Sequence, residues 1–150
     1  MNDTTTTDLG EVTYTRVFDA PRELVFRCMV TPEHLTHFWG PTGVNTPLAK
    51  IIVDPRPGGA FETTMVNDSD GSEFTMRGVY VEVTEPERLV WTEGDGPGGM
   101  TTSVTFTDLG NGKTEVVTHQ TNIPEMFRTA ETQDGMQSSF DRFAAYLAGL

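Results

Sequence analysis

The last twenty-two residues, Thr129 to Leu150, constrain the fold of this chain most strongly. Their apolar residues recur with the period of about 3.6 residues that is typical of an α-helix. They form one stripe, which consists of Met136, Phe140, Phe143, Ala144 and Leu147. Thr129 or Thr132 can cap the start of this helix, although Gly135 weakens its first turns and could move the start toward that position. An amphipathic helix cannot bury its stripe alone, so we expect a curved sheet to wrap around it.

The preceding residues alternate between short helical segments, strand-like runs and turn signals. Val12–Asp19 predicts a strand, Pro21–Met29 a short helix, and Thr31–Pro41 a second short helix with its turn. Asn111-Gly112 predicts a type I′ hairpin turn between two strands. Six further strands are predicted, at Leu48–Val53, Ala60–Val66, Ser72–Thr84, Arg88–Glu93, Met100–Thr107 and Lys113–Thr121. The order β-α-α-β-β-β-β-β-β-α with short connections predicts an α+β fold with an antiparallel sheet.

Length and charge limit the classes of function. A chain of 150 residues is the size of one domain, and we expect a flexible polar tail over residues 1–10 and a single domain over residues 11–150. We expect a cytoplasmic protein because the sequence has no membrane span, no signal peptide and only one cysteine, Cys28. The net charge of −12, from 22 acidic and 10 basic residues, argues against binding to nucleic acid or to anionic membranes.

Three motifs have the residue types of ligand sites but lack the remaining features of those sites. His34 and His37 have a spacing that suits two zinc ligands, but no further ligands accompany them. Asp68–Glu73 is similar to the start of a calcium loop but lacks the distant glutamate. Gly94–Gly99 has glycine spacing like that of a phosphate loop, yet it precedes a strand and contains no lysine. We expect no metal and no cofactor, and we interpret Gly94–Gly99 as a flexible loop that could cover a pocket.

Hydrolytic chemistry finds little support in the sequence. There is no Gly-x-Ser-x-Gly elbow and no catalytic cysteine context. A triad of Ser103, Asp95 and His119 would require these residues to meet in the fold, and we do not expect a hydrolase.

Several local motifs resemble those of the START-like superfamily, which has the helix-grip fold. More narrowly, the chain resembles the family named after activators of heat shock protein 90 ATPase, whose relatives include polyketide-cyclase-like proteins. The motifs are Phe18–Phe26, Thr31–Leu35, Phe38–Pro41, Asp54–Gly59, Gly78–Tyr80 and Pro86–Trp91. Members of the family often have a Gly-Trp pair at the start of the last helix, where this chain has Gly135-Met136.

The resemblance implies a curved antiparallel sheet that grips the C-terminal helix and encloses a cavity. We expect a hydrophobic ligand there, because pockets are mostly apolar with a few polar anchors. Tyr80, Trp91, Glu93 and His119 are the residues with polar tips that could orient such a ligand. The predicted ligand-binding residues are Phe26, Trp39, Phe61, Met76, Tyr80, Trp91, Glu93, Phe106, Met136 and Phe140.

Three functions are compatible with these features. The first is binding of a small hydrophobic or aromatic molecule. The second is an enzyme of cyclase or dehydratase type that uses Glu93 or His119 as an acid or base. The third is a chaperone-associated interaction protein, as the family name suggests. A homodimer is compatible with all three.

Overall fold

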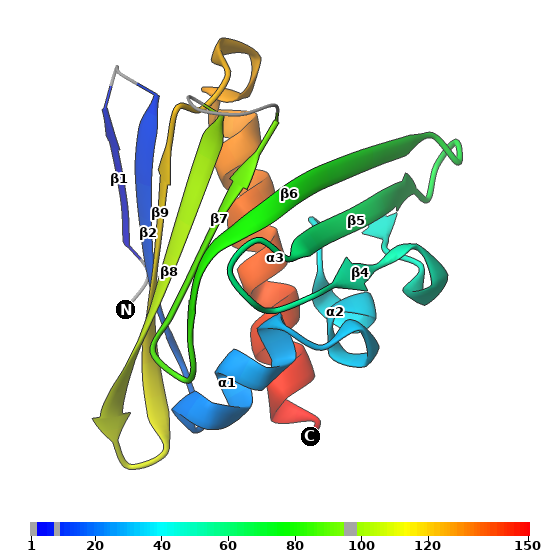
Figure 1. The fold of residues 1–150 in the computed structure, drawn as a ribbon. Helices are drawn as coiled ribbons and strands as arrows, with labels where there is room; N and C mark the ends of the chain where they lie inside the picture. Colours follow the sequence, from blue (N-terminus) through cyan, green and yellow to red (C-terminus); the bar gives the residue numbers. More distant parts are fainter. Residues whose placement is uncertain (1–2, 8–9, 95–98) are drawn as a thin grey trace.

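The computed structural model of the protein describes residues 3–7, 10–94 and 99–150. It shows a curved antiparallel sheet with one long helix across its concave face, which confirms the expected α+β helix-grip fold (Figure 1). The helices are α1 (Arg22–Met29), α2 (Pro32–Phe38) and α3 (Ala130–Ala148), with short 3-10 helices η1 (Leu48–Lys50) and η2 (Glu125–Phe127). The strands are β1 (Asp3–Thr7), β2 (Glu11–Phe18), β3 (Val44–Asn45), β4 (Ile52–Val53), β5 (Ala60–Asn67), β6 (Glu73–Thr84), β7 (Arg88–Glu93), β8 (Met100–Gly110) and β9 (Lys113–Thr121).

The sheet follows the order β1-β2-β9-β8-β7-β6-β5-β3, and β4 pairs with β5. Inward-facing residues alternate along its strands, as period-two patterning requires. On β9 these residues are Thr114, Val116, Thr118 and Gln120. The predicted hairpin between β8 and β9 is present, and Asn111 and Gly112 both have the positive φ that a type I′ turn needs.

A glycine in β6 allows the sheet to curve. A Cβ at Gly78 would lie 2.7 Å from the carbonyl oxygen of Thr92 on β7, so no larger residue fits there without a shift of the backbone. The pairing of β6 with β7 is also irregular between Tyr80 and Glu82. Figure 1 shows that β5 and the first part of β6 leave the plane of β7–β9 as an arm, which makes the sheet concave toward α3.

The C-terminal half of α3 is fixed to α2 and to the turn that follows α2. The ring of Phe143 stacks on Phe38 with centroids 4.0 Å apart, and Phe143 is only 4% exposed. The Nη1 of Arg142 donates to the carbonyl oxygens of Gly40 at 2.8 Å and Pro41 at 3.0 Å. These contacts hold one end of the helix firmly against the core.

Three local predictions differ from the structure. Within the expected tail, Asp3–Thr7 pairs with β2 as an edge strand, because a run of β-branched threonines suits a strand. The expected strand Leu48–Val53 is reduced to Ile52–Val53 and is preceded by η1. The alternative start of the last helix near Gly135 is wrong, whereas the predicted cap at Thr129 is confirmed: its hydroxyl accepts a 3.1 Å hydrogen bond from the backbone N–H of Thr132, and the helix begins at Ala130.

None of the helices within the described ranges combines the length and apolarity that crossing a lipid bilayer requires.

Candidate ligand-binding site

A hollow lies between the sheet and the N-terminal half of α3. The helix is 19 residues long, but its two fully buried residues, Phe143 and Leu147, both lie in its C-terminal half. Met136 and Phe140 from the predicted stripe pack against the core on one side but are only half-buried, because their other side faces this hollow. The stripe therefore serves two purposes: one end anchors the helix and the other end lines a cavity.

The hollow consists of two adjoining lobes, which we call the polar lobe and the apolar lobe. The polar lobe has a volume of about 460 Å³ and includes Glu93, Gln120 and Arg128 in its lining. The apolar lobe has a volume of about 610 Å³ and reaches Phe38 and Phe143 near the anchored end of α3. Shared lining residues make the two lobes continuous: Met29, Trp39, Met65, Phe74, Val104, Thr118, Phe127, Thr132, Met136 and Phe140.

The hollow opens to solvent at a rim of aromatic and methionine side chains. Phe74 on β6 meets Phe127 of η2 edge to face, with centroids 6.2 Å apart. Phe74 is 51% exposed and Met126 is 74% exposed, so this rim offers apolar surface to water. A ligand with an apolar body would cover part of that surface when it enters.

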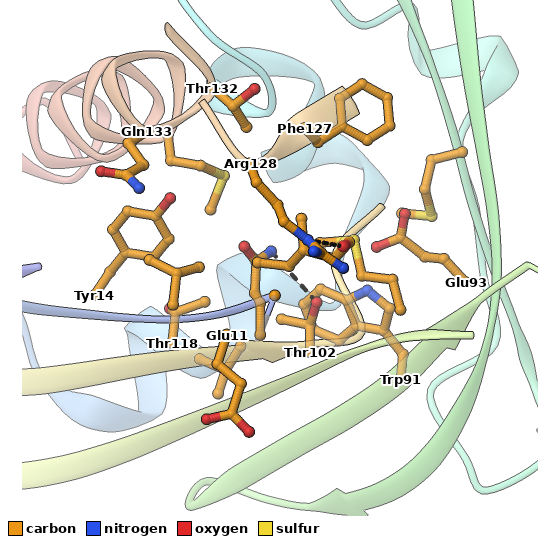
Figure 2. A pocket seen from close by; sticks show the side chains of 18 of the residues that line it. Glu11, Tyr14, Trp91, Glu93, Thr102, Thr118, Phe127, Arg128, Thr132 and Gln133 are labelled. Carbon is orange, nitrogen blue, oxygen red and sulfur yellow. Dashed lines mark hydrogen bonds between the residues drawn. The ribbon is translucent and has the colours of Figure 1, made fainter. Parts of the chain in front are cut away.

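Glu93 supplies a carboxylate at the end of β7 and lies half-buried in the polar lobe (Figure 2). Burial raises the pKa of Glu93, and the neighbouring Trp91 indole partly opposes this shift. The Nε1–H of Trp91 is itself buried and is not aligned to donate a hydrogen bond to any acceptor of the described residues. The carboxylate therefore stands among aromatic groups with little compensation for its lost hydration.

Arg128 supplies the positive charge of the polar lobe from the segment between η2 and α3. Arg128 is exposed overall, and its Nε donates to the carbonyl oxygen of Ile123 at 2.7 Å, which orients the guanidinium. The guanidinium also lies against Gly10, where an added Cβ would be 2.9 Å from its Nη2. Gly10 has φ +77°, a conformation that also favours glycine. The absence of a side chain at Gly10, just before β2, therefore leaves room for the Arg128 guanidinium.

Neutral polar side chains complete the floor of the polar lobe. The Gln120 amide donates to the Thr102 hydroxyl at 3.5 Å across the β8–β9 pair. Figure 2 shows Thr102 and Thr118 on the strands below Arg128, with Thr132 and Gln133 on the helix opposite. These groups can accept or donate further hydrogen bonds, and two of them, Thr118 and Thr132, also border the apolar lobe.

Six of the ten predicted ligand-binding residues line the polar lobe: Trp39, Met76, Trp91, Glu93, Met136 and Phe140. Both tryptophans of the chain are among them.

The other four predicted residues lie in the packed core and line neither lobe. Phe26 of α1 packs edge to face on Phe106, with centroids 5.2 Å apart. Phe61 stacks on Tyr80 at 5.3 Å, and the Tyr80 hydroxyl is buried without a partner among the described residues. Alternation placed Phe61, Tyr80 and Phe106 on the concave face correctly, but that face extends beyond the hollow into the region that the core fills, where Phe26 of α1 also packs.

His119 does not face the hollow, which corrects its interpretation as a polar anchor. The inward residues of β9 are Thr118 and Gln120, so His119 between them points to the opposite face of the sheet. Ser103 is its register partner on β8, and no hydrogen bond joins the two in the described part of the chain. Asp95, the third residue considered with them, lies outside the described residues, as does most of the predicted covering loop Gly94–Gly99.

Sequence reasoning missed the two most informative polar residues, Arg128 and Gln120. Alternation along β9 could have identified Gln120, because it shares a face with Val116 and Thr118. Arg128 lies in an irregular segment and has no periodic signal.

The residues considered for metals make other contacts. The Nδ1 of His34 is 2.5 Å from the Tyr146 hydroxyl, and His37 stacks on the Tyr146 ring with centroids 5.2 Å apart. Within residues 3–7, 10–94 and 99–150, no three histidine, cysteine, aspartate or glutamate side chains gather as metal ligands would.

Solved structures of bacterial proteins share this fold. Protein CV1439 from Chromobacterium violaceum is 27% identical with a TM-score of 0.81, and the alignment covers 91% of this chain and 96% of that one. A Rhodobacter sphaeroides protein is 17% identical with a TM-score of 0.84, over 100% and 99% of the two chains. The AHSA1 protein from Silicibacter pomeroyi is 20% identical with a TM-score of 0.76, over 93% and 98%.

A family model described as "Activator of Hsp90 ATPase homolog 1-like protein" matches residues 19–148. No curated protein sequence matches the chain.

Proposed function

The chain belongs to the family of Activator of Hsp90 ATPase homolog 1-like proteins, and we propose that it binds a small hydrophobic or aromatic molecule in the hollow under α3. The observation that carries this proposal is the two-lobed hollow itself. Its volume suits a small organic molecule, and its walls combine aromatic and methionine side chains with a few polar groups. Methionine is flexible and polarisable, so this lining can adapt to ligands of different shape.

The expected affinity follows from apolar burial. If a ligand of two fused rings buries about 300 Å² of apolar area, transfer at roughly 25 cal/mol per Å² gives about 7–8 kcal/mol before the costs of association. Association costs several kcal/mol, and contacts on the rigid wall formed by Trp39 and Trp91 offset part of this loss. Dissociation constants of roughly 1–100 μM are therefore expected.

Intrinsic fluorescence offers a direct test because Trp39 and Trp91 both line the hollow. A hydrophobic aromatic ligand is expected to quench this fluorescence saturably. Met136→Lys, which places a charged side chain in the hollow, should weaken binding by about tenfold or more. Ala145→Lys is the matched control, because Ala145 is exposed on the same helix. If a broad set of such compounds gives no saturable signal, the binding proposal fails.

One observation favours a second function, an enzyme of cyclase or dehydratase type. Glu93 is a half-buried carboxyl in the hollow whose pKa is raised by burial, which suits a general acid or base. The test is turnover of small β-dicarbonyl or β-hydroxycarbonyl compounds, with Glu93→Gln expected to abolish it. If Glu93→Gln retains full turnover, Glu93 is not the acid or base.

A chaperone-associated role rests on the family name and finds no specific support in the site. A binding measurement with a purified Hsp90 chaperone would test it independently of the hollow.

A further inference from the structure

We infer that the ligand of the hollow carries a hydroxyl group on an apolar body, as phenols and enols do, and that Arg128 and Glu93 hold this hydroxyl between them. The inference rests on the proposed binding function and names the chemical class that the polar lobe would select. It depends on how Arg128 and Glu93, two of the three charged residues that line the polar lobe, are placed.

Arg128 and Glu93 come from opposite walls of the polar lobe. Glu93 ends β7 on the sheet side, and Arg128 precedes α3 on the helix side. In Figure 2 the carboxylate and the guanidinium both extend toward the middle of the lobe. The ion pairs of the described residues do not include this couple, so a space remains between two groups of opposite charge.

Six of the ten lysine and arginine side chains are paired with carboxylates of the described residues, and Arg128 is one of the four that are not. The paired side chains are Arg16, Lys50, Arg56, Arg77, Arg88 and Lys113. Arg128 instead uses its Nε on a backbone carbonyl, and among the described residues no carboxylate pairs with its Nη groups. In a chain with 22 acidic residues, an oriented guanidinium that lines a hollow offers its remaining donors to whatever enters.

A hydroxyl group complements both walls. Arginine can only donate hydrogen bonds, an ionised carboxylate can only accept them, and a hydroxyl does both at one atom. Its oxygen would accept from the Arg128 Nη, and its proton would be donated to the Glu93 carboxylate. Burial raises the pKa of Glu93, and the nearby Trp91 indole only partly opposes this shift, so a donor from the ligand would stabilise the ionised, accepting form of the carboxylate.

Singly charged ligands fit this couple less well. A ligand carboxylate would pair with Arg128 but would stand against Glu93, and a ligand ammonium group would do the reverse. A neutral hydroxyl avoids either repulsion. The apolar lobe would then hold the body of the ligand beside Met136 and Phe140.

Two matched probes test the inference. The hydroxyl of 2-naphthol can accept and donate, whereas the ether oxygen of 2-methoxynaphthalene can only accept. Binding of each to the full chain is measured by ligand-observed NMR titration. The wild-type protein is expected to bind 2-naphthol about tenfold or more tightly than the ether, because hydrogen bonds to charged groups are worth more than neutral ones.

Variants separate the two roles. Glu93→Met removes the acceptor but keeps an unbranched side chain, so it should weaken 2-naphthol about tenfold and leave the ether unchanged. Arg128→Met removes the donor and should weaken both probes. Arg77→Met is the control, because Arg77 is exposed on β6 and its partner Glu62 lies outside both lobes. Circular dichroism verifies that each variant is folded, and Glu93→Met alone suffices if Arg128→Met does not fold.

The outcomes distinguish this inference from the proposed function. Equal binding of both probes by the wild-type protein, or a preference that survives Glu93→Met, overturns the selection of hydroxyl groups while the binding function stands. If neither probe binds, the present inference fails, whereas the binding proposal fails only if the broad fluorescence screen also finds no saturable ligand.

Discussion

Truncation of two phenylalanines on α3 separates the anchored end of this helix from the end that lines the hollow. Phe143 is 4% exposed, stacks on Phe38 at 4.0 Å and lies 4.9 Å from the ring centre of Phe18. Phe143 borders the apolar lobe at its anchored end, but two rings hold it in the core, so Phe143→Ala removes both ring contacts and extends the lobe into the core. The expected loss in the free energy of unfolding is about 3–5 kcal/mol.

Phe140 is three residues earlier and makes one ring contact, whereas Phe143 makes two. It is half-buried, lines both lobes and meets Tyr14 edge to face at 5.5 Å. Part of its surface already faces the hollow, so Phe140→Ala enlarges an existing space and creates no new void. Its expected cost is about 1–2 kcal/mol, from the lost apolar area and the one ring pair.

Urea denaturation followed by circular dichroism measures both losses, with the wild-type slope as the reference. The prediction is a difference of about 2 kcal/mol or more between the two variants. If Phe140→Ala costs as much as Phe143→Ala, the N-terminal half of α3 is packed like the C-terminal half, and the hollow is not open in solution.

Three further changes test other parts of the structure. Burial raises the pKa of Glu93, so between the ordinary glutamate pKa and the raised native pKa the native state binds more protons than the unfolded state, and stability should fall as pH rises through this range. Glu93→Gln should flatten this decline. A pH profile of thermal melting that is the same in the variant as in the wild-type protein would contradict this. Gly78→Val should destabilise the chain, because its Cβ would meet the Thr92 carbonyl, and a wild-type melting temperature would refute the close approach. Calorimetric titration with zinc should show no binding, and a stoichiometric signal lost on His34→Ala would overturn that expectation.

The fold could be predicted from the sequence because its determinants are local or periodic. The helical spacing of Phe143 and Leu147 predicted the buried side of α3, and alternation predicted which residues of β7 share a face. Asn111-Gly112 predicted the hairpin because a type I′ turn needs positive φ at both positions. Patterns of this kind depend only on backbone geometry, which the residues themselves specify.

The candidate site was only partly predictable, since its limits depend on how elements far apart in the sequence meet. Tyr80 and Trp91 have equivalent patterns on neighbouring strands, yet Tyr80 stacks within the core whereas Trp91 borders the hollow. Arg128 enters the polar lobe because η2 turns it toward Gly10, a contact across more than a hundred residues that no spacing encodes. Amino-acid type and periodicity decided which side of each element is apolar. The tertiary structure decided where those sides pack together and where they stay apart, because that depends on the curvature of the sheet and on which end of α3 is anchored.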